Sequence, residues 1–116
     1  MEFTSKSENP HFPEVWDLDP KEIHSKTAEL TLIDVRRADE FVGELGHIPG
    51  ATLLTLDQLP AQLDSLSKDK TIVFVCRSGG RSAQATSFAL ENGFSDVFNM
   101  RGGMLLWNEY GLKIEK

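Results

Sequence analysis

The hydrophobic residues of this chain gather in short runs separated by polar and glycine-rich segments. Residues 30–35, 71–75 and 96–100 are rich in β-branched and aromatic side chains, which is typical of strands. The run at 71–75 is apolar at almost every position, as strands are when a parallel sheet is covered on both faces. A Pro-Gly turn within residues 46–54 predicts a further strand after it. We therefore expect several short strands in one buried sheet.

Helices are predicted between these strands. Asp19 is a candidate N-cap before Pro20, and Glu22 is placed to complete a capping box. Asp57 is a candidate cap for a segment whose leucines recur at near-helical spacing. Further helices are expected at residues 37–45, after the cysteine as far as 92–93, and at 102–111. Because strands and helices alternate, the pattern predicts an α/β domain with a mainly parallel sheet.

The first residues of the chain differ from the rest. Residues 1–13 are rich in Ser, Glu, Asn and Pro and offer few apolar side chains, so we expect a flexible N-terminal arm with little to bury. Residues 14–116 carry all the predicted helices and strands and are expected to form one domain, in keeping with a chain of 116 residues.

Charge and composition narrow the function. Lys and Arg number 12 and Asp and Glu 18, a net charge of −6, which argues against general nucleic-acid binding. No apolar run is long enough to span a membrane, and the start lacks the pattern of a signal peptide. A single cysteine excludes an internal disulfide, and the three histidines are too scattered to predict a metal site. We expect a cytoplasmic monomer without cofactor or metal.

The single cysteine has a distinctive setting. Cys76 ends the buried run at 71–75 and is followed by Arg77, two glycines and Arg81 at the start of a predicted helix. Ligands of open α/β sheets bind at the carboxyl ends of strands. A glycine-rich turn at a helix N-terminus presents backbone N–H groups to an anion, and here it favours a thiolate. A buried, inert cysteine would need none of these neighbours.

These motifs together resemble the rhodanese, or sulfurtransferase, domain. The sequence "CRSGGRS" follows "LIDVR", "EF" and "GHIPGA" and precedes "GGMLLW", and the resemblance covers roughly residues 16–115. It implies a three-layer α/β fold, with a mainly parallel sheet of four to five strands flanked by helices on both faces. It also implies that Cys76 carries a sulfane sulfur as a persulfide. The residues implied to bind the donor are Arg77, Ser78, Gly79, Gly80, Arg81 and Ser82.

The length of the loop favours one activity within this resemblance. Four residues separate Cys76 from Arg81, whereas cysteine phosphatases with a similar loop have five. A basic loop also resembles those of thiosulfate-using members, and two cations suit a doubly charged donor. We expect a thiosulfate sulfurtransferase that passes sulfur to cyanide or to an external thiol, since no second cysteine exists here. Two alternatives stay open, namely a persulfide carrier that docks on a partner protein, and a related phosphatase or arsenate reductase.

Residues outside the loop are assigned mainly structural roles. Asp34 and Arg36 are expected to tie a strand end to neighbouring loops, and Glu40 to cap or pair locally. Arg36 is also a candidate for the pocket rim, as is Arg101. His47 is read as a turn residue rather than a base, because a thiolate needs none. Phe88 and Trp107 are expected to anchor the core.

Overall fold

The computed structural model describes residues 1–116 and contains one sheet of six strands, in the order β1-β2-β6-β5-β3-β4. The strands are β1 (Ser7–Glu8), β2 (Trp16–Leu18), β3 (Thr31–Asp34), β4 (Thr52–Leu53), β5 (Ile72–Val75) and β6 (Val97–Met100). The helices are α1 (Pro20–Ser25), α2 (Ala38–Phe41), α3 (Leu59–Gln62), α4 (Gly80–Glu91) and α5 (Gly103–Glu109), with 3₁₀ turns at Thr27–Glu29 and Leu63–Ser65.

The sheet is parallel except for its first strand. β5 lies between β3 and β6, with Phe74 opposite both Ile33 and Asn99, and only β1 runs antiparallel, against β2. The predicted α/β class with a mainly parallel sheet is therefore confirmed. The strand expected after the Pro-Gly turn is present as β4. The sheet has six strands rather than four to five, because β1 adds a two-residue strand that has no apolar run by which a strand is recognised in a sequence.

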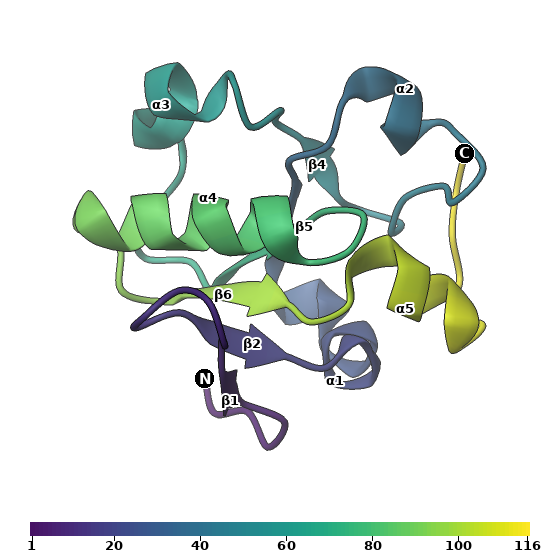
Figure 1. The fold of residues 1–116 in the computed structure, drawn as a ribbon, viewed down its shortest axis with the longest axis horizontal. Coiled ribbons are helices and arrows are strands. Elements are labelled where there is room, and N and C mark those ends of the chain that lie inside the picture. The colour runs from purple at the N-terminus through teal and green to yellow at the C-terminus, as the bar shows by residue number, and fades with distance from the viewer.

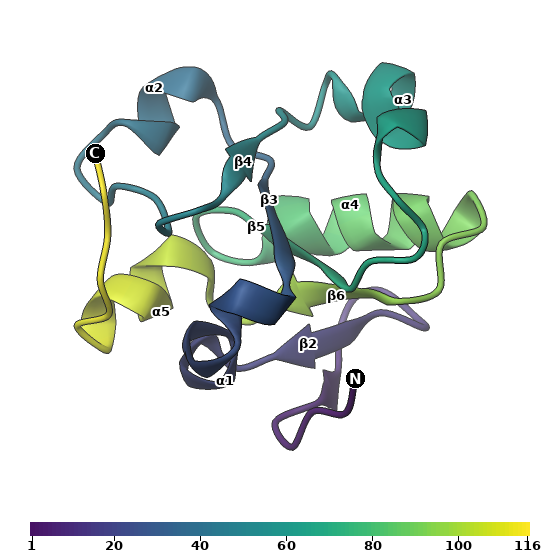
Figure 2. The ribbon, with the colours of Figure 1, turned by 180° about the vertical axis from the view of Figure 1, so that it is seen from behind.

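Helices cover both faces of the sheet and divide the core into two clusters (Figures 1 and 2). On one face, β3 and β5 pack against α3 and α4 through residues such as Phe74, Leu59 and Ala85. On the other face, β2, β5 and β6 pack against α1 and α5, where Trp107 is fully buried. Side chains alternate along each strand, which is why neighbouring residues of β5 belong to different clusters.

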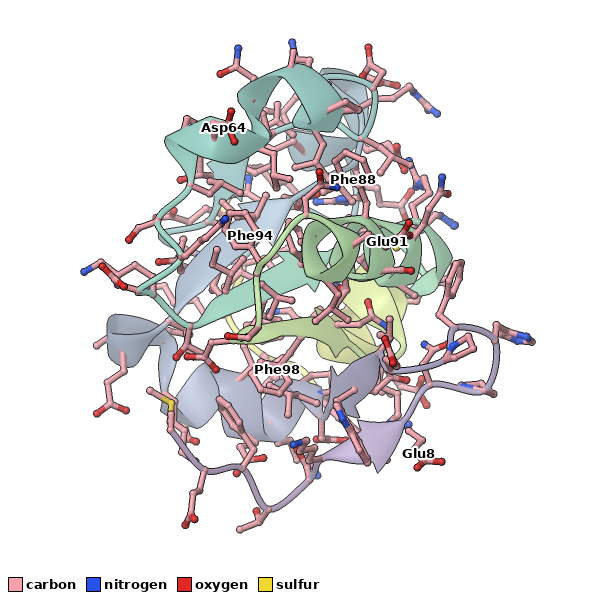
Figure 3. All side chains as sticks on the ribbon, turned by 90° about the vertical axis from the view of Figure 1, so that its left-hand side faces the viewer. Glu8, Asp64, Phe88, Glu91, Phe94 and Phe98 are labelled. Carbon is pink, nitrogen blue, oxygen red and sulfur yellow. The ribbon has the colours of Figure 1, made fainter.

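The phenylalanines follow the same division (Figure 3). Phe94 and Phe88 lie on the α4 side of the sheet, and Phe88 packs against that core as the sequence predicts. Phe98 lies on the opposite side, where its ring meets the edge of the Phe3 ring at a centroid distance of 5.1 Å. Glu8 of β1 is exposed.

The predicted cap at Asp19 is present, but the predicted roles of Glu22 and Asp57 in capping are not. Asp19 caps α1 by accepting a hydrogen bond from the Lys21 N–H, but Glu22 does not complete a capping box. Its carboxylate instead accepts hydrogen bonds from the backbone and hydroxyl groups of Thr4 and Ser5. Asp57 caps nothing, because α3 begins after Gln58 and the first turn is closed by the Thr55 carbonyl.

The N-terminal segment makes specific contacts with the domain, although none of residues 1–13 is buried. Phe3 packs on Phe98, β1 pairs with β2, and Ser5 Oγ accepts the N–H of Asp19. Little of the segment is buried, as its composition indicates, but a few of its residues reach specific partners across the sheet edge. The flexibility of residues 1–13 in solution stays a prediction. None of the helices has the length and apolar character needed to cross a membrane.

Candidate active site

Cys76 lies where β5 ends and the loop to α4 begins, at the carboxyl end of the sheet. In Figure 1 this loop curls beside the start of α5. The side chain of Cys76 is buried, with 1% of its surface exposed. Its Sγ lies 3.1 Å from the N–H nitrogen of Gly79, which donates to it, and 3.2 Å from Ser82 Oγ. The predicted nucleophile is therefore enclosed by its own loop.

The loop leaves a set of backbone donors free. Only the Gly79 N–H is bonded to Cys76, and α4 makes its first helical bond from Ala83 to the Gly79 carbonyl. The backbone N–H groups without a partner in the protein are those of Arg77, Ser78, Gly80, Arg81 and Ser82. Because the first N–H groups of a helix have no internal acceptor, they are available to an anion beside the sulfur.

Glycines allow this loop to form and to be held from behind. Gly79 adopts φ = 103°, a left-handed conformation that other residues seldom adopt. Gly103, at the start of α5, would place a Cβ 2.4 Å from the carbonyl of Arg77. This close approach lets the N–H groups of Met104 and Leu105 donate to the carbonyls of Cys76 and Arg77, at 2.8 and 3.0 Å. The "GG" of the sequence thus fixes the back of the loop.

The two loop arginines have different surroundings. Arg77 is exposed and forms no ion pair. Arg81 forms two parallel hydrogen bonds to the carboxylate of Glu40, at 2.7 and 2.9 Å. These bonds lower the pKa of Glu40 to about 2, and the backbone N–H of Arg37 adds to the effect. Glu40 therefore caps locally, as predicted, but it also neutralises one of the two cations expected to attract a donor.

The two arginines proposed for the pocket rim, Arg36 and Arg101, also differ in burial and in their partners. Arg36 is buried, and its guanidinium bonds the Asp34 carboxylate and the carbonyls of Glu40 and Gly46. It has the structural role that the sequence predicts, with its charge already paired. Arg101 is half-exposed and is paired with Asp19, yet it lines a cavity of about 490 Å³ beside the loop.

That cavity has the N-terminal segment as its other wall. Its lining includes residues 7–12, together with Ser78, Gly79 and Gly80 of the loop. Only two of its 14 lining residues are hydrophobic, and Glu8, His11, Asp17 and Arg101 contribute ionisable side chains. No group of His, Cys, Asp and Glu side chains is arranged to hold a metal ion.

Sequence reasoning missed a group of buried polar side chains behind the cysteine. Asn99 accepts a hydrogen bond from Ser82 and donates one to Asp17, and all three are buried. Asn99 could have been noticed in the sequence, because it is the single polar residue inside the apolar run of β6. Its hydrogen-bond partners could not be predicted, because they lie on different elements. His47, in contrast, stacks on Phe41 and bonds its carbonyl, in keeping with a turn residue.

Comparisons with known proteins agree with this geometry. A family model described as the Rhodanese-like domain matches residues 19–110. A putative sulfurtransferase of Bacillus subtilis is 47% identical over 79 residues, which cover 68% of this chain and 74% of that protein. A thiosulfate sulfurtransferase of Pseudoalteromonas translucida is 32% identical over 89 residues, which cover 76% and 83%. The crystal structure of a rhodanese-like domain protein from Staphylococcus aureus superposes with a TM-score of 0.74 at 33% identity, covering 86% of this chain and 98% of that one.

Proposed function

The chain belongs to the Rhodanese-like domain family of sulfurtransferases, and we propose that it moves the outer sulfur of thiosulfate through a persulfide on Cys76. The observation that carries the proposal is the loop itself. The buried thiol accepts one N–H of its own loop, and five further N–H groups of that loop have no partner in the protein, which supports a site for a small sulfur-containing anion.

The first half-reaction needs only the loop and the donor. The Cys76 thiolate attacks the outer sulfur of thiosulfate, the sulfur–sulfur bond of the donor breaks, and sulfite leaves with the electron pair. A new bond joins Sγ to the transferred sulfur, which now carries the negative charge. The free N–H groups of the loop would hold that charge, so no general base is required.

The second half-reaction returns the enzyme to its starting state. Cyanide or an external thiolate attacks the outer sulfur of the persulfide, and the bond to Sγ breaks with its electrons returning to Cys76. Thiocyanate or a new persulfide is released. The acceptor has to come from outside the chain, because Cys76 is the only cysteine.

The attraction of an anionic donor to this site comes mainly from one side chain, Arg77, and from backbone N–H groups. Since Arg81 is paired with Glu40, the free cation beside the loop is Arg77. A dianion such as thiosulfate would therefore meet one mobile positive charge together with the aligned N–H groups at the start of α4.

The proposal predicts a mass change that cyanide reverses. The reduced protein should gain the mass of one sulfur atom on brief incubation with thiosulfate, because the persulfide is a stable covalent intermediate. Cyanide should remove that mass and release thiocyanate. Intact-protein mass spectrometry before and after each addition measures both steps.

Cys76→Ser serves as the control, and it should show neither the mass gain nor thiocyanate. A mass gain that cyanide removes only slowly, but a protein thiol removes fast, would favour a persulfide carrier over a thiosulfate:cyanide enzyme. Absence of any mass gain, together with hydrolysis of an aryl phosphate, would instead support the phosphatase alternative and defeat the proposal.

A further inference from the structure

A row of hydrogen-bonded side chains runs from Cys76 to the N-terminal segment. Ser82 Oγ lies 3.2 Å from Cys76 Sγ and 2.5 Å from Asn99 Oδ1. Asn99 Nδ2 donates to Asp17 Oδ1 at 2.9 Å, and Asn9 Nδ2 donates to the same oxygen at 3.0 Å. Asp17 on β2 is the register partner of Asn99 on β6, so the sheet itself holds the middle of this row.

Asn9, at the N-terminal end of the row, determines which group donates and which accepts in each hydrogen bond of the row. Asn9 Oδ1 accepts the backbone N–H groups of His11 and Phe12, so its NH₂ group faces Asp17. An ionised carboxylate can only accept hydrogen bonds. Asn99 therefore also turns its NH₂ group toward Asp17, and its carbonyl oxygen is left facing Ser82.

The orientation of Asn99 affects the sulfur through the hydroxyl hydrogen of Ser82. The Ser82 hydroxyl has one hydrogen to donate, and the buried oxygen of Asn99 takes it. Ser82 consequently presents a lone pair, not a hydrogen, to Cys76 Sγ. A thiol S–H can donate to that lone pair, but a thiolate cannot. For Ser82 to stabilise a thiolate, its hydrogen has to leave Asn99 Oδ1, which would then be buried without a donor.

We propose that Asp17 is a positioning residue that acts through Asn99 and Ser82 to disfavour negative charge on Sγ of Cys76. In the persulfide the charge lies on the outer sulfur among the loop N–H groups, so the loaded state escapes this penalty. The row thereby makes the resting thiol less reactive toward alkylating agents and toward the donor, but it does not destabilise the persulfide once it has formed. The statement about the persulfide rests on the proposed function, whereas the statement about the thiolate concerns the free cysteine alone.

Two further observations agree with this role. Asp17 is 5% exposed and its partners are amides, not cations, so its charge adds to the effect on the thiolate. It also precedes residue 19, where the family match begins, so the row extends beyond the matched domain.

The other charged groups around the loop are unchanged by substitutions at Asp17 or Ser82. Three of the four nearby arginines are in pairs, and only Arg77 is free. These groups belong to the loop itself and to the segments around β3, α2, α4, the starts of α1 and α5, and the N-terminus. They are Asp34, Arg36, Asp39, Glu40, Glu44, Arg77, Arg81, Arg101, Asp19, Glu8 and His11.

Asp17→Asn tests the proposal because it permits the row from residue 17 to Ser82 to reverse. The new amide can donate to Asn99, which can then turn its NH₂ group toward Ser82, and Ser82 can donate to the sulfur. Only the NH₂ group of Asn9 loses its acceptor, and Asn9 is half-buried and lines the cavity, where water can replace that acceptor. The pH midpoint of iodoacetamide labelling should fall by about one pH unit. Labelling reports on one site, since the chain has one cysteine, and the S–H stretching band in Raman spectra gives the same midpoint independently.

Glu8→Gln is the matched control, because it removes an exposed carboxylate that lines the same cavity but lies outside the row. Its midpoint should stay within about 0.2 pH units of the parent. Ser82→Ala gives a test that does not depend on the folding of the Asp17 variant. Loss of the lone pair should lower the midpoint, whereas a serine that donates to the thiolate would make the midpoint rise.

The double variant distinguishes an effect of Asp17 that passes through the hydrogen bonds of Asn99 and Ser82 from the electrostatic effect of removing its negative charge. In a Ser82→Ala background, Asp17→Asn should produce less than half of its shift in the parent chain. An equal shift in both backgrounds, or a midpoint that rises in either single variant, would overturn the proposal. Because labelling requires no sulfur donor, this result stands apart from the thiosulfate mass experiment, whose failure would defeat the proposed function alone.

Discussion

At the scale of single residues, the distance between α5 and the active-site loop depends on one glycine. Gly103 has φ = 59° and lies where an added Cβ would be 2.4 Å from the Arg77 carbonyl. Any side chain there has to displace the backbone that donates to Cys76 and Arg77. The loop that shapes the sulfur site is therefore sensitive to a methyl group that never touches the sulfur.

We expect Gly103→Ala to lower stability by at least about 3 kcal/mol, from backbone strain together with the clash. It should also lower thiosulfate-dependent thiocyanate formation at least about tenfold, because a displacement near 1 Å in a site costs that much or more. Chemical denaturation and steady-state assays measure the two effects.

Gly111→Ala is the matched control for this prediction. Gly111 also has a positive φ, of 71°, but nothing lies within 4 Å of a Cβ added there. It should cost about 1–2 kcal/mol from backbone strain alone and leave activity unchanged. Equal losses for the two variants would show that the approach of α5 to the loop is not what the glycine provides.

The same scale shows what the sequence could and could not predict at the site. Cys76, the loop glycines and the "GG" of residues 102–103 are close in sequence to the elements they serve, so their pattern is readable. Asp17 and Asn99 are 82 positions apart and meet only because β2 pairs with β6. No spacing rule connects them, and so the polar row behind the cysteine could not be anticipated.

At the scale of elements, α2 is held to α4 by the Glu40–Arg81 pair. The pair spans 41 positions, and the Glu40 side chain is only 14% exposed. The sequence indicated each helix and even a local role for Glu40, but the long-range partner depends on how β3 and β5 place the two helix starts side by side. This explains why the sequence did not predict the ion pair of Arg81, whereas the role of Arg81 in binding the donor stays a prediction.

Glu40→Gln is expected to lower stability by roughly 1–2 kcal/mol near pH 7, allowing for the partial exposure of Arg81. The pH dependence has a definite sign. Because the pKa of Glu40 is lowered from 4.5 to about 2, its stabilisation is present above pH 4.5 and is lost as the pH falls toward 2. The stability difference between parent and variant should therefore shrink across that window, as measured by urea denaturation at several pH values.

Asp39→Asn provides the comparison for that series. Asp39 pairs with Arg37 on the exposed side of the same helix, and both side chains are largely in solvent. Its substitution should change stability little at any pH. If the Asp39 variant loses as much stability as the Glu40 variant, surface charge on α2 rather than the link to α4 accounts for the effect.

At the scale of the whole molecule, the family match and the folded unit have different boundaries. The match begins at residue 19, yet β1 completes the sheet edge and Phe3 covers Phe98 on the face opposite α4. The sequence predicted the α/β architecture because alternating strands and helices leave few alternatives. It did not predict the edge strand, since a two-residue strand has no hydrophobic periodicity, and its pairing is set by partners elsewhere.

Removal of residues 1–13 should therefore weaken the whole fold. The truncated chain loses the Phe3 contact, the β1 pairing and the bonds from Thr4 and Ser5 to Glu22. Together these predict a loss of roughly 2–3 kcal/mol, or a melting temperature lower by on the order of 10 °C. Removal of Met1 and Glu2 alone, which deletes one exposed hydrogen bond from Lys26, should have little effect. An unchanged melting temperature in the longer truncation would instead establish residues 14–116 as the complete folding unit, with the first 13 residues as a separate arm.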